Sequence, residues 1–346
     1  MDPFQTWRKD LIKRLQAGQD LRVDLGVGAK LIEAAAGRAS GADAKRLGDW
    51  GRALRKEGNR NPVPRQEVAL DEELATLATR YPDRGLSGPQ HLFRAWPEIV
   101  RQTRSAACIA LFADFDGTLT PIRRWPGRVY LGGRVRALLA ETSRNGVTVG
   151  IISGRRLPDV QKRVGLPGIW YVGAHGYALQ EPRGKAVTFI SEKALSRMHI
   201  VRRKLASELR GMPGIFLEPK EATLAVHYRN AAPATRQAAR EVIQQLLELY
   251  PQLHLLSGKK VWELLPDRRT SKWTAIRHIL KLARRRRSGR RLVFYLGDDS
   301  TDELVFEKMK GISVVVGRRR LTAARFFLRS PAEVKEFLVR FCEVVR

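Results

Sequence analysis

Residues 112–118 read Phe112-Ala113-Asp114-Phe115-Asp116-Gly117-Thr118, with two carboxylates two positions apart. It ends an apolar run from Ala106 to Ala113, which predicts a buried strand with carboxylates at its tip. Because residues i and i+2 of a strand point the same way, we expect Asp114 and Asp116 to face one pocket. Two carboxylates that close repel each other unless a cation lies between them. The alternative interpretation is a strand followed by an ordinary Asp-Gly turn.

Two further apolar runs end in groups that carry chemistry. Residues 291–296 predict a second strand, and the segment 297–303 that follows it holds four carboxylates. Such acids suit the hard oxygen ligands of magnesium and the residues that support those ligands. Residues 147–152 predict a third strand, and the Ser-Gly-Arg tip at 153–155 offers a hydroxyl and backbone N–H groups to a phosphate.

Taken in order, these motifs resemble those of the haloacid dehalogenase-type phosphatases. The matching stretches are Asp114–Leu119, Ser153–Arg155, the single Lys272 and Gly297–Glu303. More narrowly, the chain resembles the trehalose-6-phosphate phosphatase family from residue 109 to residue 345. This narrower resemblance is carried by Gly173–Gly176, Glu218-x-Lys220 followed by His227–Arg229, and Trp262–Leu264. One departure is Trp273, where many members of the family have glycine after the lysine.

The resemblance implies a magnesium-dependent phosphatase that hydrolyses trehalose 6-phosphate to trehalose and phosphate, the last step of trehalose biosynthesis, through an aspartyl phosphate. It makes Asp114 the nucleophile, Asp116 the general acid and base, and Lys272 the residue that balances the charge of the phosphate and the nucleophile. It assigns Asp114, the backbone carbonyl of Asp116 and Asp298 as ligands of Mg²⁺. Asp302 and Asp299 would support these ligands without binding the ion directly. The residues expected to bind phosphate or sugar are Thr118, Ser153, Gly154, Arg155, His175, Glu218, Lys220, Arg229 and Glu263. The alternative for the charged cap positions is a solvated strand face.

About 120 residues separate the second motif from Lys272, which is too many for one crossover and predicts an inserted domain. Inside it the patterns favour strands at 185–190 and 223–228, helices at 191–209 and 234–249, and a hairpin at 253–264. The expected fold class is α/β: a doubly wound, Rossmann-like parallel-sheet core with an inserted α+β cap and an N-terminal helical extension. The predicted divisions are 1–100 for the extension, 101–177 with 265–346 for the core, and 178–264 for the cap.

The first hundred residues carry helical patterns but no motif that names a role. Helices are predicted at 6–16, 28–36, 44–54, 71–80 and 89–103, with a linker at 59–64. Packing on the core, self-association and binding of a partner remain open, and self-association or packing is favoured. The sequence has no signal-peptide pattern and no apolar span of membrane length, and its two cysteines suit buried free thiols, so we expect a cytoplasmic protein.

The chain is strongly basic, with 64 Lys and Arg residues against 35 Asp and Glu, a net charge of +29 and a pI near 11. The excess lies beyond residue 100 and is densest at 284–287, 290–291 and 318–320. Such runs are usually solvated, and no aromatic interleaving or nucleic-acid motif accompanies them, so no specific nucleic acid and no membrane is expected as partner. The alternatives are a phosphatase for sucrose phosphate, mannosylglycerate phosphate or another sugar phosphate, and a polyanion-binding protein.

Overall fold

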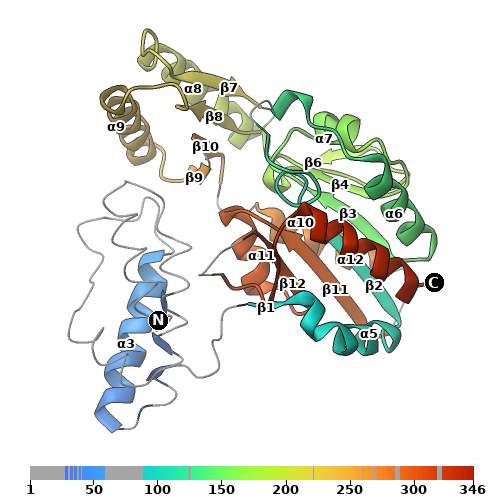
Figure 1. Ribbon diagram of the computed structural model, residues 1–346. Coiled ribbons are helices and arrows are strands. Elements are labelled where there is room, and N and C mark those ends of the chain that lie inside the picture. The colour runs from blue at the N-terminus through green and yellow to red at the C-terminus, as the bar shows by residue number, and fades with distance from the viewer. Residues whose placement is uncertain are drawn as a thin grey trace.

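A computed structural model gives the arrangement of the chain (Figure 1). It describes residues 41–58 and 89–346, except 124–125, 221, 259, 268–269, 285–288 and 318–321, and also positions 28, 29, 32, 33, 35, 36 and 39. The predicted helices at 6–16 and 71–80, the linker at 59–64 and most of the basic stretches at 284–287 and 318–320 lie outside these residues. Among the helices that the structure describes, none combines the length and apolar character that crossing a bilayer requires.

The core is a nine-stranded sheet in the order β1-β13-β12-β11-β2-β3-β4-β5-β6. Strands β1 through β4 in this order are parallel, and β5 and β6 add an antiparallel edge. The strands are β1 (Gln90–His91), β2 (Cys108–Ala113), β3 (Thr148–Ile152), β4 (Trp170–Gly173), β5 (Ala178–Gln180), β6 (Ala186–Thr188), β11 (Arg291–Gly297), β12 (Ile312–Val316) and β13 (Phe326–Leu328).

Helices cover both faces of this sheet, as a doubly wound fold requires. One face packs against α5 (Trp96–Arg104), α6 (Gly133–Arg144), α7 (Leu157–Val164) and α12 (Pro331–Val344). The other face packs against α10 (Lys272–Arg284) and α11 (Glu303–Lys308). Because both faces are covered, the central strands are apolar along their whole length, which is why they could be recognised as short apolar runs. The predicted fold class is confirmed.

The strand order places the predicted motifs at one edge of the sheet. From β2 the chain passes to β3 and β4 on one side, and it returns later to β11 and β12 on the other side. Ligands bind such folds outside the carboxyl ends of the strands, where the order reverses. The tips of β2, β3 and β11 therefore meet at this reversal, and these are the tips that carry Asp114, Ser153 and Asp298.

The cap is a four-stranded antiparallel sheet with two helices on one face. Its strand order is β7-β8-β10-β9, with β7 (Phe216–Pro219), β8 (Leu224–His227), β9 (His254–Gly258) and β10 (Val261–Leu265). The helices are α8 (Glu192–Glu208) and α9 (Pro233–Leu249), and they bury an apolar cluster that includes Trp262. Ser191 caps α8 by accepting a hydrogen bond from the backbone N–H of Ala194. Figure 1 shows these elements as a lobe beside the core sheet.

Two predicted domain boundaries are wrong in detail. Residues 178–190 were expected in the cap, but β5 and β6 pair with β4 and extend the core sheet, so the cap begins after them. Residues 89–100 were expected in the N-terminal extension, but β1 pairs with β13 in the core sheet. The 3₁₀ helix η2 (Leu92–Ala95) and α5 follow β1, and Leu92 and Ile99 lie in the core cluster. The predicted helix at 89–103 therefore begins later, because a short strand precedes it.

In the N-terminal extension the structure describes α3 (Gly41–Gly58), which confirms the predicted helix at 44–54. Helical positions between 28 and 36 pack on it at Gly51, where a Cβ atom would lie 2.9 Å from Glu33. Arg55 of α3 bonds to Glu33, and its guanidinium also lies 3.6 Å from Glu307 of α11. This contact joins the extension to the core beside the fourth motif.

Candidate active site

Asp114 is the first residue after β2, and its backbone N–H bonds to the carbonyl of Leu296 on β11 at 2.8 Å. The side chain of Asp114 is almost fully buried. Gly117, three residues later, has a φ of +84° and lies directly under the carboxylate of Asp298. A Cβ atom at position 117 would stand 2.1 Å from the nearer oxygen of Asp298. Only glycine fits this position, so the turn of the first motif also makes room for the acid of the fourth.

Lys272 lies between two buried carboxylates. Its Nζ donates to Oδ1 of Asp114 at 2.8 Å and to Oδ1 of Asp302 at 2.7 Å. Lys272 is the first residue of α10, whose N-terminus is capped by Ser271. Burial lowers the pKa of Lys272, but the two carboxylates outweigh burial and raise that pKa, so the lysine stays charged.

Asp302 is held by donors on both oxygens and is fully buried. Its Oδ1 accepts from Tyr295 as well as from Lys272, and its Oδ2 accepts from the backbone N–H of Asp299 at 2.9 Å. Asp299 itself caps the short helix η5 (Ser300–Asp302) by accepting from the N–H of Ser300. The fourth motif is therefore a capping box as well as a group of acids.

Asp114, Asp298 and Asp302 form the candidate metal site. One carboxylate oxygen from each lies within 4.8 Å of the others. The donors are all oxygens, which is the set that hard divalent cations take. Burial raises the pKa of Asp114 well above its usual value, and the nearby Asp302 and Asp298 raise it further against the opposing effect of Lys272. Since three carboxylates lie close together and Lys272 bonds to only two of them, a bound cation would relieve their repulsion, and the residues fit such a group.

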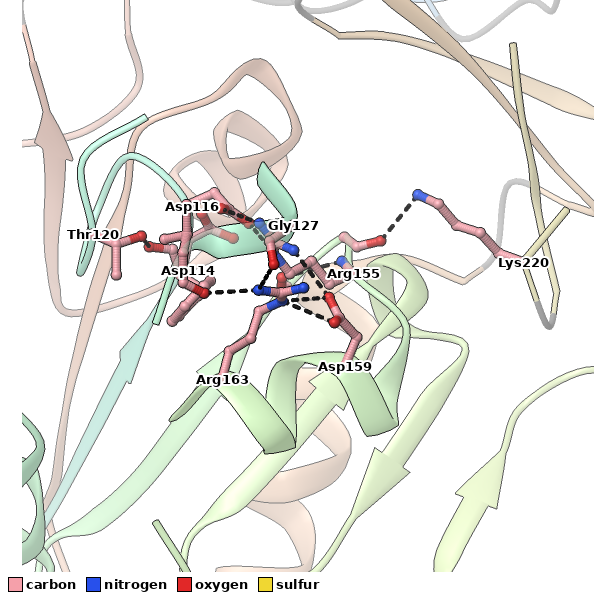
Figure 2. Close-up of polar contacts among 12 residues, drawn as sticks. Asp114, Asp116, Thr120, Gly127, Arg155, Asp159, Arg163 and Lys220 are labelled. Atoms are coloured by element: carbon pink, nitrogen blue, oxygen red, sulfur yellow. Dashed lines mark hydrogen bonds and ion pairs between the residues drawn. The ribbon is translucent and has the colours of Figure 1, made fainter. Parts of the chain in front are cut away.

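Arg155, predicted to bind phosphate, holds Asp116 (Figure 2). Its Nε and Nη2 donate to the two oxygens of Asp116 at 2.6 and 2.8 Å, and its Nη1 donates to Asp159 at 2.9 Å. The guanidinium also lies 5.5 Å from the centre of the Phe115 ring. Burial lowers the pKa of Arg155, but its two carboxylate partners raise it on balance. Asp116 and Asp114 thus have separate partners, Arg155 and Lys272.

Two hydroxyls lie buried at the tips of β2 and β3. Thr118 is fully buried, and its Oγ1 has no hydrogen-bond partner among the residues that the structure describes. Ser153 is almost fully buried, and its Oγ accepts from the N–H of Arg155 at 3.1 Å. A buried hydroxyl without a partner is unfavourable unless a ligand supplies one. The position of Thr118 therefore agrees with the phosphate contact predicted for it.

A second polar cluster joins the cap to the core and is centred on Glu263 of β10. Oε1 of Glu263 accepts from Lys220 at 2.9 Å and from Thr223 at 2.6 Å, and Oε2 lies 3.0 Å from both Lys220 Nζ and His175 Nε2. Lys220 also reaches the carbonyl of Gly154 at 3.3 Å, and Figure 2 shows it pointing from the cap toward the second motif. Burial alone would raise the pKa of Glu263, but His175 and Lys220 hold it well below its usual value.

His175 lies where the core meets this cluster. Its φ of 57° is left-handed, and its ring packs so closely on Gly154 that a Cβ there would lie 2.5 Å from it. Since Glu263 is ionised and can only accept, Nε2 of His175 carries the proton. Its Nδ1 is buried and has no hydrogen-bond partner in the part of the chain that the structure describes.

Glu218 and Arg229 lie farther out on the cap. Glu218 bonds to Nε2 of His227 at 2.8 Å, and this bond lowers the pKa of Glu218 despite partial burial. Arg229 lies exposed in the turn after β8 and is not brought to the other predicted residues by any contact that the structure describes. The structure thus gathers Glu218, Lys220, Glu263 and His175 on the side of the cap that meets the core, and it leaves Arg229 at the rim.

Three residues of the site were missed by the sequence analysis: Thr223, Asp159 and Tyr295. Thr223 and Asp159 support Glu263 and Arg155, and Tyr295 supports Asp302. Asp159 lies four residues after Arg155 in α7, a spacing that brings the two together on a helix and could have been noticed. Nothing in the local sequence marks Thr223 or Tyr295, because the partner of Thr223 lies on the distant strand β10 and the partner of Tyr295 is brought to it by the turn after β11.

Solved structures share this fold. The C-terminal domain of trehalose-6-phosphate phosphatase from C. albicans superposes with a TM-score of 0.63 at 21% identity, covering 74% of this chain and 98% of that one. A trehalose-6-phosphate phosphatase from Aspergillus fumigatus gives a TM-score of 0.55 at 26% identity, covering 74% of this chain and 99% of that one.

Curated relatives are closer in sequence. A trehalose-phosphate phosphatase of Mycobacterium tuberculosis is 38% identical over 250 residues, and one of Mycobacterium avium is 36% identical over 249 residues. These matches cover 68% of this chain and 62% of each relative. The chain therefore matches less than two thirds of the length of these relatives.

Two family models match different parts of the chain. Residues 1–98 match the model for domain N/S of alpha-1,4-glucan:maltose-1-phosphate maltosyltransferase, which is a minor part of the chain. Residues 112–331 match the trehalose-phosphatase model, and this region, more than half of the chain, contains every residue of the site described above. The chain belongs to the trehalose-phosphatase family.

Proposed function

We propose that this chain is a magnesium-dependent phosphatase that hydrolyses trehalose 6-phosphate to trehalose and phosphate. The observation that carries the proposal is the buried centre of Asp114, Lys272, Asp298 and Asp302, placed where the cap cluster around Glu263 reaches the core. A centre of this charge suits a phosphoryl group, and a polar cap beside it suits a sugar. Family membership and the named relatives support trehalose 6-phosphate as the substrate.

Mg²⁺ would be held by Asp114, Asp298 and the backbone carbonyl of Asp116, with Asp302 behind them. When bound, the ion supplies charge neutralisation for the phosphoryl oxygens. Asp302 has little capacity left for direct ligation, since Lys272, Tyr295 and the N–H of Asp299 already bond to its two oxygens. This supports a role behind the ligands, where it would fix Lys272 and the shape of the loop.

The reaction has two displacements at phosphorus. A carboxylate oxygen of Asp114 forms a bond to phosphorus while the bond from phosphorus to the sugar oxygen breaks, and Asp116 gives that oxygen its proton. Water then attacks the aspartyl phosphate, Asp116 takes a proton from the water, and the bond from phosphorus to Asp114 breaks. Arg155 holds Asp116 beside the site, and the hydroxyls of Thr118 and Ser153 are placed to donate to phosphoryl oxygens.

Sugar recognition is assigned to the cap. Both oxygens of Glu263 accept two donors each, which fills the acceptor positions of a carboxylate. A sugar hydroxyl can bond to Glu263 only by replacing one of these donors, so substrate binding must rearrange this cluster. Lys220 is the donor that we expect to move, because it also spans the boundary between cap and core. We assign Glu218, His175 and Arg229 to the remaining hydroxyl contacts.

The test is phosphate release from a panel of substrates with magnesium present and then with the metal chelated. The panel contains trehalose 6-phosphate, sucrose 6-phosphate, glucose 6-phosphate and an aryl phosphate. Strong preference for trehalose 6-phosphate, lost on chelation and restored by magnesium, is the expected result. Preference for another sugar phosphate would support the proposed phosphatase reaction and contradict trehalose 6-phosphate as the substrate. Absence of hydrolysis would favour the polyanion-binding alternative.

Three further predictions concern partners and location. Most of the arginine runs lie outside the described residues, so the absence of a nucleic-acid partner is untested. Self-association through the N-terminal helices and a cytoplasmic location are likewise predictions.

A further inference from the structure

The two faces of the cap sheet differ in character. On one face, Leu224, Val226, Trp262 and Leu264 pack against α8 and α9. Side chains alternate between faces along a strand, so Glu263, between Trp262 and Leu264, points away from these helices. It points to the core, as its contact with His175 shows. The face opposite the helices is therefore the face on which the proposed sugar site lies.

Strand register identifies the other residues of this face. Glu218, Ala225 and Glu263 are directly opposite one another on β7, β8 and β10. Two residues farther along, Phe216 and His227 are directly opposite each other on β7 and β8. Directly opposed residues of antiparallel strands project to the same side. Phe216 and His227 therefore share the face of Glu218 and Glu263, one step farther from the core.

Phe216 is an exposed aromatic residue in an ordered setting. Its relative exposure is 63%, the highest among the large hydrophobic residues in the described part of the chain. Its ring lies beside that of His227, with centroids 5.9 Å apart and planes inclined by 37°. His227 is in turn held by Glu218 at 2.8 Å. An exposed aromatic ring next to a hydrogen-bonded pair of histidine and glutamate resembles the lining of a ligand site, which combines aromatic surface with a few placed polar groups.

We propose that Phe216, supported by His227, is an aromatic platform on which a pyranose ring of the sugar phosphate stacks. The inference rests on the proposed function. The C–H bonds on one face of a pyranose form an apolar surface with slight positive charge, which suits the negative face of an aromatic ring. The hydroxyls at the rim of the same pyranose would reach Glu218, so one ring of the sugar meets both kinds of contact.

Position along the cap assigns the platform to the ring that is farther from the phosphate. Lys220 touches Gly154 at the second motif, and Phe216 precedes Lys220 by four residues, roughly 13 Å of extended chain. A phosphate held between Asp114 and Ser153 places the first ring of the sugar phosphate nearest the second motif. The second ring of a disaccharide then lies toward Glu218 and Phe216, whereas a monosaccharide phosphate has no ring to place there.

Steady-state kinetics of Phe216→Ala on trehalose 6-phosphate, glucose 6-phosphate and an aryl phosphate tests the platform. We expect KM for trehalose 6-phosphate to rise about tenfold, as the loss of one aromatic contact implies, with kcat unchanged. Constants for the two smaller substrates should stay at wild-type values. Phe216→Tyr should restore the wild-type KM. Leu249→Ala removes a similarly exposed side chain, 60% exposed, from α9 on the opposite face of the cap, and should change nothing.

The outcomes separate this inference from the proposed function. Wild-type protein that releases no phosphate from trehalose 6-phosphate overturns both. Wild-type turnover with an unchanged KM in Phe216→Ala overturns the platform alone, and so does an equal loss on all three substrates, which would indicate a structural role. If Leu249→Ala raises KM as much as Phe216→Ala does, the platform is also overturned. Phe216 would then be explained as a surface for another protein.

Discussion

At the scale of single residues, the site depends on a buried lysine shared by two carboxylates. Lys272 lies 2.8 Å from Asp114 and 2.7 Å from Asp302, and all three side chains are nearly or fully buried. A buried pair of this kind contributes little net stability, but removing one partner leaves an uncompensated charge. The charges therefore constrain both folding and chemistry, and different substitutions separate the two effects.

Asp114→Asn should abolish phosphate release and leave the fold intact. Asparagine keeps the size of the side chain and an oxygen that can accept from Lys272, but its amide is a poor nucleophile. Initial rates with trehalose 6-phosphate, combined with the midpoint of thermal unfolding, give both results. Hydrolysis at an appreciable fraction of the wild-type rate would contradict the assignment of the nucleophile.

Lys272→Met should reduce the free energy of unfolding by about 3–5 kcal/mol, because Asp114 and Asp302 then remain buried without their cation. Urea denaturation without magnesium measures this loss. Lys281→Met is the matched control, since Lys281 is an exposed residue of the same helix α10. Equal unfolding free energies for the two variants would contradict the described charge arrangement.

At the scale of elements, the ends of strands and the loops that follow them carry the chemistry. The sequence located the tips of β2, β3 and β11 correctly because each strand is a short apolar run that ends in charged or glycine residues. It did not reveal which acid each base contacts, since Arg155 and Asp116 lie 39 residues apart and meet only through the parallel pairing of β2 and β3.

The predicted cap boundary is wrong for the same reason: the local sequence does not show which distant segment a strand contacts. Residues 186–188 form the predicted strand, but all three side chains of β6 are exposed. A strand without a buried face carries no pattern that says which sheet it joins. Pairing with β5, which is fixed by β4, places it in the core.

Glu263→Ala should impair turnover of trehalose 6-phosphate far more than turnover of a small aryl phosphate. Glu263 holds Lys220, Thr223 and His175 together at the cap, and none of its described contacts reaches Asp114. The ratio of kcat/KM for the two substrates measures the effect. Equal losses on both substrates would contradict a role in sugar recognition.

The lowered pKa of Glu263 predicts that the stability of the protein depends on pH. His175 and Lys220 lower the pKa of Glu263 in the folded protein, so its contribution is complete above the unfolded pKa near 4.5 and declines as pH falls below that value. The difference in unfolding free energy between wild type and Glu263→Gln should therefore shrink from about pH 7 to about pH 3. A difference that stays constant over this range would contradict the lowered pKa.

At the scale of the whole molecule, the core includes residues that precede the first motif. β1 forms the outer edge of the nine-stranded sheet, and α5 packs on α12, where Trp96 meets Phe337. The sequence placed these residues in a separate extension because no motif precedes residue 112. A two-residue strand such as β1 carries no readable periodicity, and only its pairing with β13 identifies it.

Ile99→Ala should therefore destabilise the core by about 2–5 kcal/mol, the usual range for a buried isoleucine. Ile99 is 1% exposed in the main core cluster, whereas Ile122, the matched control, is 54% exposed. Denaturant unfolding of both alanine variants measures the difference. If Ile99→Ala is no more destabilising than Ile122→Ala, residues 89–104 do not belong to the core.

The most direct test of the whole account follows the phosphoryl group from trehalose 6-phosphate onto the protein. Enzyme turning over trehalose 6-phosphate labelled in its phosphate is quenched in acid, digested and analysed by mass spectrometry. We expect labelled phosphate on the peptide that contains Asp114, no label in Asp114→Asn, and one trehalose released for each phosphoryl group transferred to the protein. Release of phosphate with no label on that peptide, or label on another residue, would contradict it.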